Sequence, residues 1–95
     1  MYLRITHGHF DPARYDEMSS LVQQAASAIQ GLPGNQSVYV GMDRTGGRTY
    51  TVSTWDTVEH AGFNRETAPK LGEVVGKLVS LGVQFDPPVV VEIVN

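Results

Sequence analysis

The sequence predicts an α+β fold with the element order β-α-β-β-α-β, and three observations support this class. Two amphipathic helical patterns flank a pair of strand patterns joined by a glycine-containing turn. Another strand pattern begins the chain, and a valine-rich one ends it. The chain has 95 residues and no repeat or linker, so residues 1–95 are expected to form a single domain. The simplest compact arrangement is ferredoxin-like, a four-stranded antiparallel sheet with both helices on one face.

The first half of the chain predicts a strand, a long helix and a turn. Residues 2–10 mix β-branched, aromatic and polar residues, as a short strand does. Asp11 and Pro12 favour a helix start, because Asp is a good N-cap and Pro loses no hydrogen bond in the first turn. Residues 31–34, Gly-Leu-Pro-Gly, end the helix. Its apolar positions recur at spacings of three and four, at Tyr15, Met18, Val22, Ala25, Ala26 and Ile29.

The second half predicts a hairpin, two helices and a last strand. Residues 43–47 suit a turn between a strand at 37–42 and one from about Arg48 to Trp55. Asp56 or Thr57 caps a short helix. The longer helix that follows ends at Gly82, and Pro87-Pro88 separates it from a strand at 89–94. The apolar stripe of that helix is Leu71, Val74, Val75, Leu78 and Val79.

The last strand is apolar on both of its sides. Val89, Val91 and Ile93 project one way, Val90 and Val94 project the other, and only Glu92 interrupts them. Such a strand is usually buried on both sides. Because the helices cover one face of the sheet only, we expect a homodimer in which the sheets pack together. The alternative is an edge strand that is merely rich in valine.

Composition and charge exclude several classes of function. Seven Lys and Arg residues, scattered in a chain of net charge −3, argue against a nucleic-acid partner. The lack of cysteine excludes disulfides, thiolate catalysis and thiolate metal ligands. No apolar run approaches the roughly 20 residues that span a bilayer, and no signal-peptide pattern begins the chain. A cytoplasmic protein without a membrane partner is therefore expected, although a mature secreted form would look the same.

Three hydroxyl side chains, Thr49, Thr51 and Ser53, share one side of a predicted strand with Trp55. Buried hydroxyls need hydrogen-bond partners, so this row suggests a pocket holding water or a ligand. Alternatively, this side of the strand is exposed and Trp55 caps the core. The face of the sheet that carries the row is not readable from sequence, because strand register is not.

The histidines are candidates for proton transfer or metal binding. His7 and His9 flank one residue of a strand and project to the same side. His7 is a possible proton acceptor, since the unperturbed pKa of imidazole lies near neutrality. The pair is also half of a metal site whose third ligand would be Glu59, His60 or another carboxylate. The plainer interpretation is that one imidazole is exposed and the other is hydrogen-bonded.

His60 and Asn64 lie four residues apart and so share one face of the short helix, with Phe63 nearby. They point either toward Trp55 or out to water, and for His60 exposure to water is favoured.

One segment resembles a known family. The residues GGRTYTVSTWDTVEHAGFNRETAPK are similar to the middle of antibiotic biosynthesis monooxygenases, members of the dimeric α+β barrel superfamily. The shared pattern is a strand that ends in Trp, followed by an acidic residue, a hydroxyl residue and a Glu, here Trp55, Asp56, Thr57 and Glu59. The upstream LPGNQSVYVGMDR, the terminal FDPPVVVEIV and the order of elements are similar too.

The resemblance implies a subunit that dimerises through its sheet and keeps a pocket between sheet and helices. It also implies, for some members, oxidation of aromatic or quinol substrates by O₂ without metal or flavin, the substrate anion itself reducing oxygen. Asn64 stands where many members have a His, and residues 68–70 (Ala-Pro-Lys) occupy the place of a second frequent His. Haem ligation, as in the haem-degrading relatives, is therefore not expected.

We therefore predict a monooxygenase that needs no cofactor and no metal and acts on a phenolic, quinol or polyketide-like aromatic. Trp55 would stack on the ring, His7 would accept the proton, and Asn64 would orient an oxygen. The remaining predicted ligand contacts are Thr51, Ser53, His9, His60 and Phe63. A non-catalytic dimer that binds a small hydrophobic molecule in the same pocket is the alternative, and the position of His7 discriminates the two. A metal-dependent variant using His7 and His9 is a third possibility.

Overall fold

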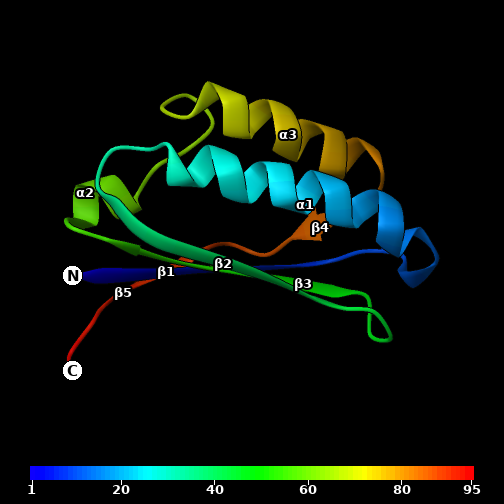
Figure 1. The fold of residues 1–95 in the computed structure, drawn as a ribbon, viewed down its shortest axis with the longest axis horizontal. Coiled ribbons are helices and arrows are strands. Elements are labelled where there is room, and N and C mark those ends of the chain that lie inside the picture. Colours follow the sequence, from blue (N-terminus) through cyan, green and yellow to red (C-terminus); the bar gives the residue numbers. More distant parts are fainter.

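A computed structural model describes residues 1–95. The chain forms an antiparallel sheet with its helices on one face, which confirms the predicted fold class (Figure 1). The elements are β1 (Tyr2–His9), a 3₁₀ turn η1 (Pro12–Arg14), α1 (Tyr15–Gln30), β2 (Asn35–Asp43), β3 (Arg48–Trp55), α2 (Val58–Ala61), α3 (Pro69–Ser80), β4 (Gln84–Phe85) and β5 (Val89–Glu92).

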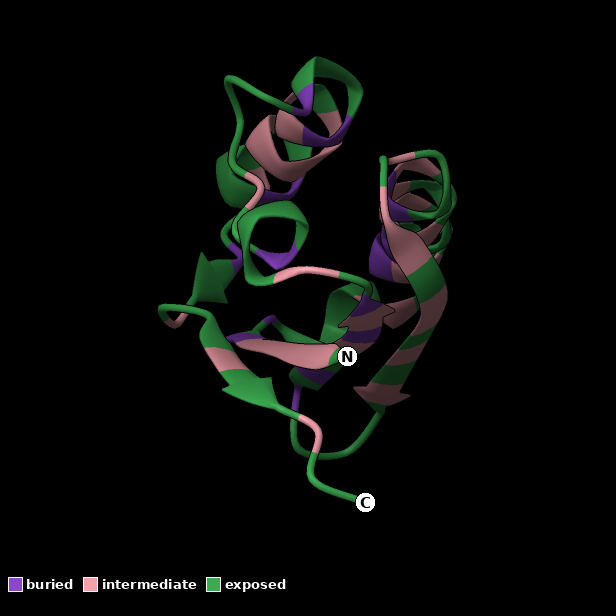
Figure 2. Cartoon of the chain, turned by 90° about the vertical axis from the view of Figure 1, so that its left-hand side faces the viewer, coloured by how far each residue is buried: buried purple, intermediate pink, exposed green.

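The sheet has the order β2-β3-β1, and β4 and β5 both pair with the remaining edge of β1. β1 pairs with β3 along its whole length, from Tyr2 opposite Trp55 to His9 opposite Arg48. α1 and α3 lie side by side above this sheet, and buried residues concentrate where the helices face it (Figure 2). None of the helices combines the length and apolar character that crossing a bilayer requires.

The predicted last strand differs from the observed one. β5 corresponds to the strand predicted at 89–94, and a short strand that was not expected, β4, precedes residues 86–88. Pro87-Pro88 separates the two strands, because neither proline has a backbone N–H to donate to the sheet. The strand also ends earlier than predicted, at Glu92 instead of Val94.

The helix caps follow the sequence, which left Asp56 and Thr57 open as the cap of the short helix. The Asp11 side chain accepts a hydrogen bond from the Ala13 N–H at 3.0 Å, although the first turn is 3₁₀. Thr57, not Asp56, caps α2 by accepting from the His60 N–H at 3.1 Å.

The apolar core is divided into two clusters between the helices and the sheet. One contains Phe10, Met18, Val22, Leu78 and Val83. The other contains Ile29, Trp55, Ala61, Ala68 and Leu71. Because the core is divided, a space lined by members of both clusters remains between them.

The opposite face of the sheet carries no helix (Figure 1). Val89 and Val91 project to this outer face and are 53% and 44% exposed, while Val90 lies half-buried on the helix side. Within one chain the last strand is therefore covered on one side only.

Candidate functional site: an apolar pocket and a histidine cluster

The register of β1 against β3 places the hydroxyl row on the face of the sheet that carries the helices. Thr49 and Ser53 are buried there, and Thr51 is half-buried opposite Thr6. Arg4 lies opposite Ser53 on the same face. The hydroxyls therefore face the interior.

A pocket of about 560 Å³ lies between the sheet and the helices. This volume falls in the range of small-molecule sites, roughly 300–1,000 Å³. Its apolar wall comes mainly from α1 and α3, through Val22, Ala25, Ile29, Leu71, Val75 and Leu78. Its polar and charged side comes from the sheet, from the loop after α2 and from the connection before β5, through Arg4, Thr6, Thr49, Thr51, Asn64, Arg65 and Asp86.

Arg4 is the most unusual group in the pocket. Its Nη1 donates to the carbonyls of Ala61 at 2.8 Å and Phe63 at 3.1 Å, and its guanidinium carbon lies 3.9 Å from the centre of the Phe63 ring. The Nε of Arg4 is buried and has no hydrogen-bond partner. Burial lowers the pKa of Arg4 from its ordinary value, although a guanidinium remains charged at neutral pH. The pocket thus contains a cation with a free donor, the type of group that binds an anionic oxygen.

Three of the predicted ligand contacts line this pocket: Thr51, Phe63 and Asn64. The Thr51 hydroxyl makes no hydrogen bond within the chain. The Asn64 side-chain oxygen accepts from the backbone N–H groups of Glu66 at 2.9 Å and Thr67 at 3.1 Å. Only the Asn64 amide nitrogen is therefore left to contact a ligand.

Trp55 and Ser53 lie in the core and do not line the pocket. The Trp55 side chain is fully buried, and its Nε1 donates to the Ser53 Oγ at 2.9 Å. The Phe63 ring packs against it with 5.0 Å between ring centroids. Phe63 and Phe85 are the aromatic residues that line the pocket, and Trp55 supports Phe63, so the stacking of Trp55 on a ligand stays a prediction without support from this geometry.

His60 lies at the surface, where its Nδ1 is 2.7 Å from the Asp56 Oδ1. This hydrogen bond lowers the pKa of Asp56. His60 does not line the pocket, so its predicted contact with a ligand has no support here. The side chain is exposed to water, as the sequence favoured.

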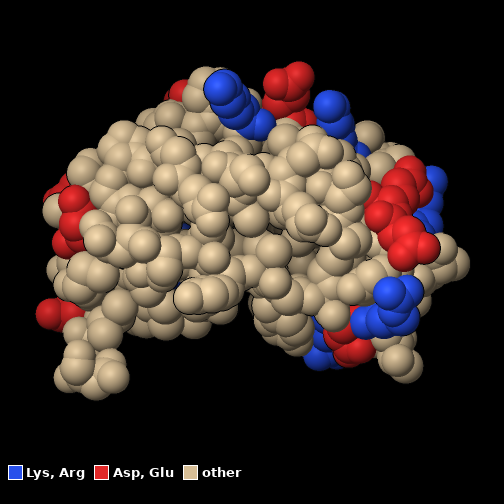
Figure 3. Space-filling model, in the orientation of Figure 1, with Lys and Arg blue, Asp and Glu red and all other residues tan.

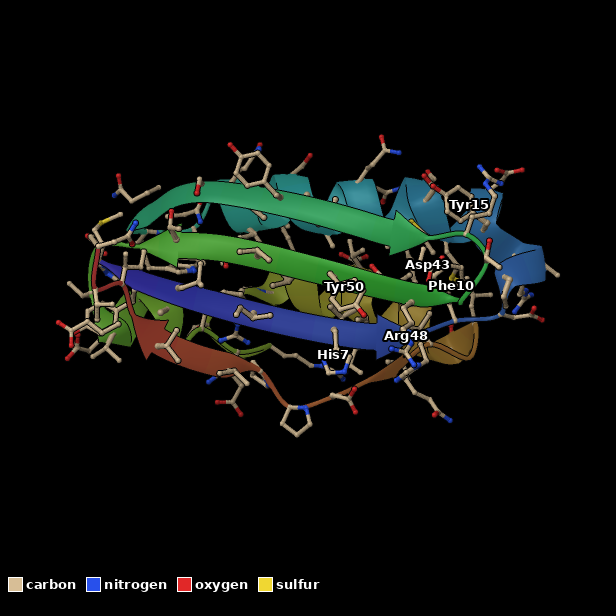
Figure 4. The ribbon with its side chains drawn as sticks, turned by 90° about the horizontal axis from the view of Figure 1, so that it is seen from below. His7, Phe10, Tyr15, Asp43, Arg48 and Tyr50 are labelled. Carbon is tan, nitrogen blue, oxygen red and sulfur yellow. The ribbon has the colours of Figure 1, made fainter.

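His7 projects to the outer face of the sheet, away from the pocket (Figure 4). His9, two residues further along β1, projects to the same face. The His7 ring stacks on Tyr50, with 5.9 Å between centroids, and His9 meets it edge-on at 6.0 Å. The His7 Nε2 lies 2.5 Å from the Asp86 Oδ2, and the His9 Nε2 lies 3.7 Å from the same atom. Within one chain neither imidazole reaches the pocket, so the role of His7 as proton acceptor stays a prediction without geometric support.

Sequence reasoning missed Arg4 and Asp86. The available signal for Arg4 was its position two residues before Thr6, since alternate residues of β1 share the face of the hydroxyl row. Asp86 had a weaker signal, a carboxylate immediately before Pro87-Pro88.

No family model and no curated protein matches the chain. Solved structures match its fold. A protein of Deinococcus radiodurans that carries the provisional name antibiotic biosynthesis monooxygenase superposes with a TM-score of 0.82, at 16% identity over 100% of this chain and 94% of that one. A protein of Nitrosomonas europaea with the same provisional name gives 0.81, at 14% identity over 100% of both chains.

A third structure is a mutant of SnoaB from Streptomyces nogalater, named a cofactor-independent oxygenase. Its TM-score is 0.71, at 13% identity over 97% of this chain and 92% of that one. At these identities the shared property is the fold. The resemblance expected from the sequence is confirmed at that level, and the chain has the fold of these monooxygenase-named proteins.

Proposed function

We propose that this protein is a cofactor-independent monooxygenase that binds a small aromatic substrate as its anion. The observation that carries the proposal is Arg4, a cation whose buried Nε has no partner in the chain, in a pocket whose opposite wall is apolar. A phenolate or quinolate oxygen would give this donor the partner that the chain does not supply.

The chemistry follows from that contact. A hydrogen bond between a charged donor and an anion contributes about 1.5–3 kcal/mol. This would lower the pKa of a bound phenol by about one to two units, because each unit corresponds to about 1.4 kcal/mol. The anion is the electron-rich form that reduces O₂. The substrate supplies all the electrons: counted from its neutral form it loses two hydrogens, one oxygen atom of O₂ enters the ring system, and the other leaves with these hydrogens as water. The helix side chains would exclude bulk water from the site.

Arg4→Met tests the proposal, because methionine keeps the apolar stem and removes the charge. We expect the variant to bind hydroquinone and anthrone anions about 10- to 100-fold more weakly, each factor of ten corresponding to about 1.4 kcal/mol. Oxygen uptake, measured with an electrode, should fall in parallel. Calorimetric binding of a neutral methyl ether of the same ring should change little.

The matched control is Arg44→Met at a side chain that is 67% exposed and outside the pocket. It should leave binding and oxygen uptake unchanged. Equal affinity of wild type and the folded Arg4 variant for the anions would overturn the proposal.

The second candidate is a non-catalytic protein that binds the same class of anion. It is favoured by one observation, that no histidine lines the pocket. The same experiments separate the two functions: saturable, Arg4-dependent binding with no oxygen uptake across the panel would support the second.

We also propose that a second copy of the chain covers the apolar part of the outer face of the sheet, beside the end that carries His7 and His9. Leu3, Ile5, Val52, Val89 and Val91 project there from three adjacent strands. A contiguous apolar surface of this kind is typical of an interface. Light scattering on the purified chain would measure the mass and test the dimer.

A further inference from the structure

We propose that His7, His9 and Asp86 form a binding site for a divalent transition-metal ion of the Zn²⁺ type. The ligand atoms of these three residues all lie within 4.8 Å of one another. Two imidazoles and one carboxylate form a ligand set that suits zinc and several other first-row metals. Asp86 also lines the pocket, but the substrate chemistry proposed above needs no metal. The sequence identified the histidine pair, and the structure adds Asp86 as the third ligand.

The backbone holds the three side chains together. The extended conformation of β1 directs His7 and His9 to the same side of the strand. The Asp86 N–H donates to the His7 carbonyl at 2.9 Å, which fixes Asp86 beside them. Pro87 follows directly and restricts the backbone after Asp86. The ligands therefore come from the sheet and a stiff connection, and not from a loose loop.

Gly8, between the histidines, allows this close approach. A Cβ at position 8 would lie 2.9 Å from the Gln84 carbonyl oxygen and 3.0 Å from the Phe85 ring. Any larger residue would push β4, and Asp86 with it, away from β1. The pattern His-Gly-His is thus required for the third ligand to be near.

The separations suit a metal after small side-chain rotations. Ligand atoms about 2.1 Å from a tetrahedral zinc lie about 3.4 Å apart. The two imidazole nitrogens are now 2.5 Å and 3.7 Å from the Asp86 oxygen, on either side of that value. Each of the three side chains is 44–48% exposed, which leaves room for water at the remaining coordination positions.

One neighbouring charge opposes cation binding. Arg48 lies opposite His9 in β3 and projects to the same face. Its positive charge would weaken the attraction, so Arg48→Ala should tighten binding by a few-fold.

Calorimetric titration of the tag-free, full-length chain with Zn²⁺ tests the site. We expect one ion per chain, and at least tenfold weaker binding in His9→Ala and in Asp86→Asn. Both side chains are well exposed, and circular dichroism would verify that these variants fold. Titration with Co²⁺ gives a second readout, since its visible absorption reports the coordination geometry and should change in the same variants.

The chain provides a matched control in its other histidine–aspartate pair. His60 and Asp56 are 2.7 Å apart but have no second imidazole beside them. His60→Ala should keep the wild-type affinity and stoichiometry, and so should Arg4→Met, which disables the pocket only. Absence of a saturable Zn²⁺ heat, or an equal loss of binding in His60→Ala and His9→Ala, would overturn the proposal.

Discussion

Gly8→Ala is the substitution whose effect the structure specifies best. Gly8 lies in β1 at a negative φ, so alanine can adopt its backbone conformation. The added Cβ would meet the Gln84 carbonyl oxygen at 2.9 Å and Phe85 Cδ1 at 3.0 Å. The first of these is a backbone atom, so β4 itself must move.

Gly41→Ala provides the reference. Gly41 lies in β2, also at a negative φ, and a Cβ there meets nothing within 4 Å. Both substitutions reduce the entropy of the unfolded chain by a similar amount, about 0.4–1 kcal/mol in stability. This contribution cancels in the comparison. The difference between the two variants then isolates the cost of overpacking, about 1–3 kcal/mol.

Urea denaturation measures the two free energies of unfolding. Gly41→Ala should be as stable as wild type or slightly more stable, and Gly8→Ala less stable by the overpacking cost. A domain of this size shifts its Tm by about 4–8 °C per kcal/mol. Exchange of the Asp86 amide hydrogen, which bonds the His7 carbonyl, should also be faster in Gly8→Ala. Equal stability of both alanine variants would refute the argument that β4 lies close to β1 only because position 8 has no side chain.

The remaining predictions concern the outer face and the pH dependence of one surface pair. Val91→Glu should convert the proposed dimer to a monomer in light scattering. Val79→Glu, at a similarly exposed valine of α3, should leave the mass unchanged. A monomeric wild type would count against the dimer. The hydrogen bond from His60 lowers the pKa of Asp56 in the folded chain. The stability that this carboxylate contributes is therefore fully present above the pKa of Asp56 in the unfolded chain. It disappears as the pH falls through the lower pKa of the folded chain. His60→Ala should raise the pKa of Asp56 in an NMR titration of its carboxyl carbon, and an unchanged pKa would show that the pair does not form in solution.

The sequence predicted the elements wherever the signals are local. The bounds of β3, Arg48 to Trp55, are those expected, because the strand lies between a turn and a helix cap. Asp11 caps the first turn as expected for the same reason. The two-residue strand β4, just before Asp86 and Pro87-Pro88, was not predicted.

The candidate site was less predictable, because its polar groups depend on contacts between distant residues. Arg4 is held by carbonyls 57 and 59 residues further along the chain. Asp86 approaches His7 only because the chain returns along β1 after α3. Strand alternation did predict that His7 and His9 share a side, but which side that is depends on register. The same uncertainty led Trp55, a core residue, to be predicted as a ligand contact.

The proline pair between β4 and β5 also affects how the chain meets other chains. Along this edge of the sheet the pairing strands have two and four residues, and two consecutive residues between them offer no N–H group. A strand from another molecule therefore cannot form a long continuous ladder there, which is how natural sheets avoid edge-to-edge aggregation. The break that brings Asp86 to the histidines thus also protects the molecule from amyloid-like growth along that border.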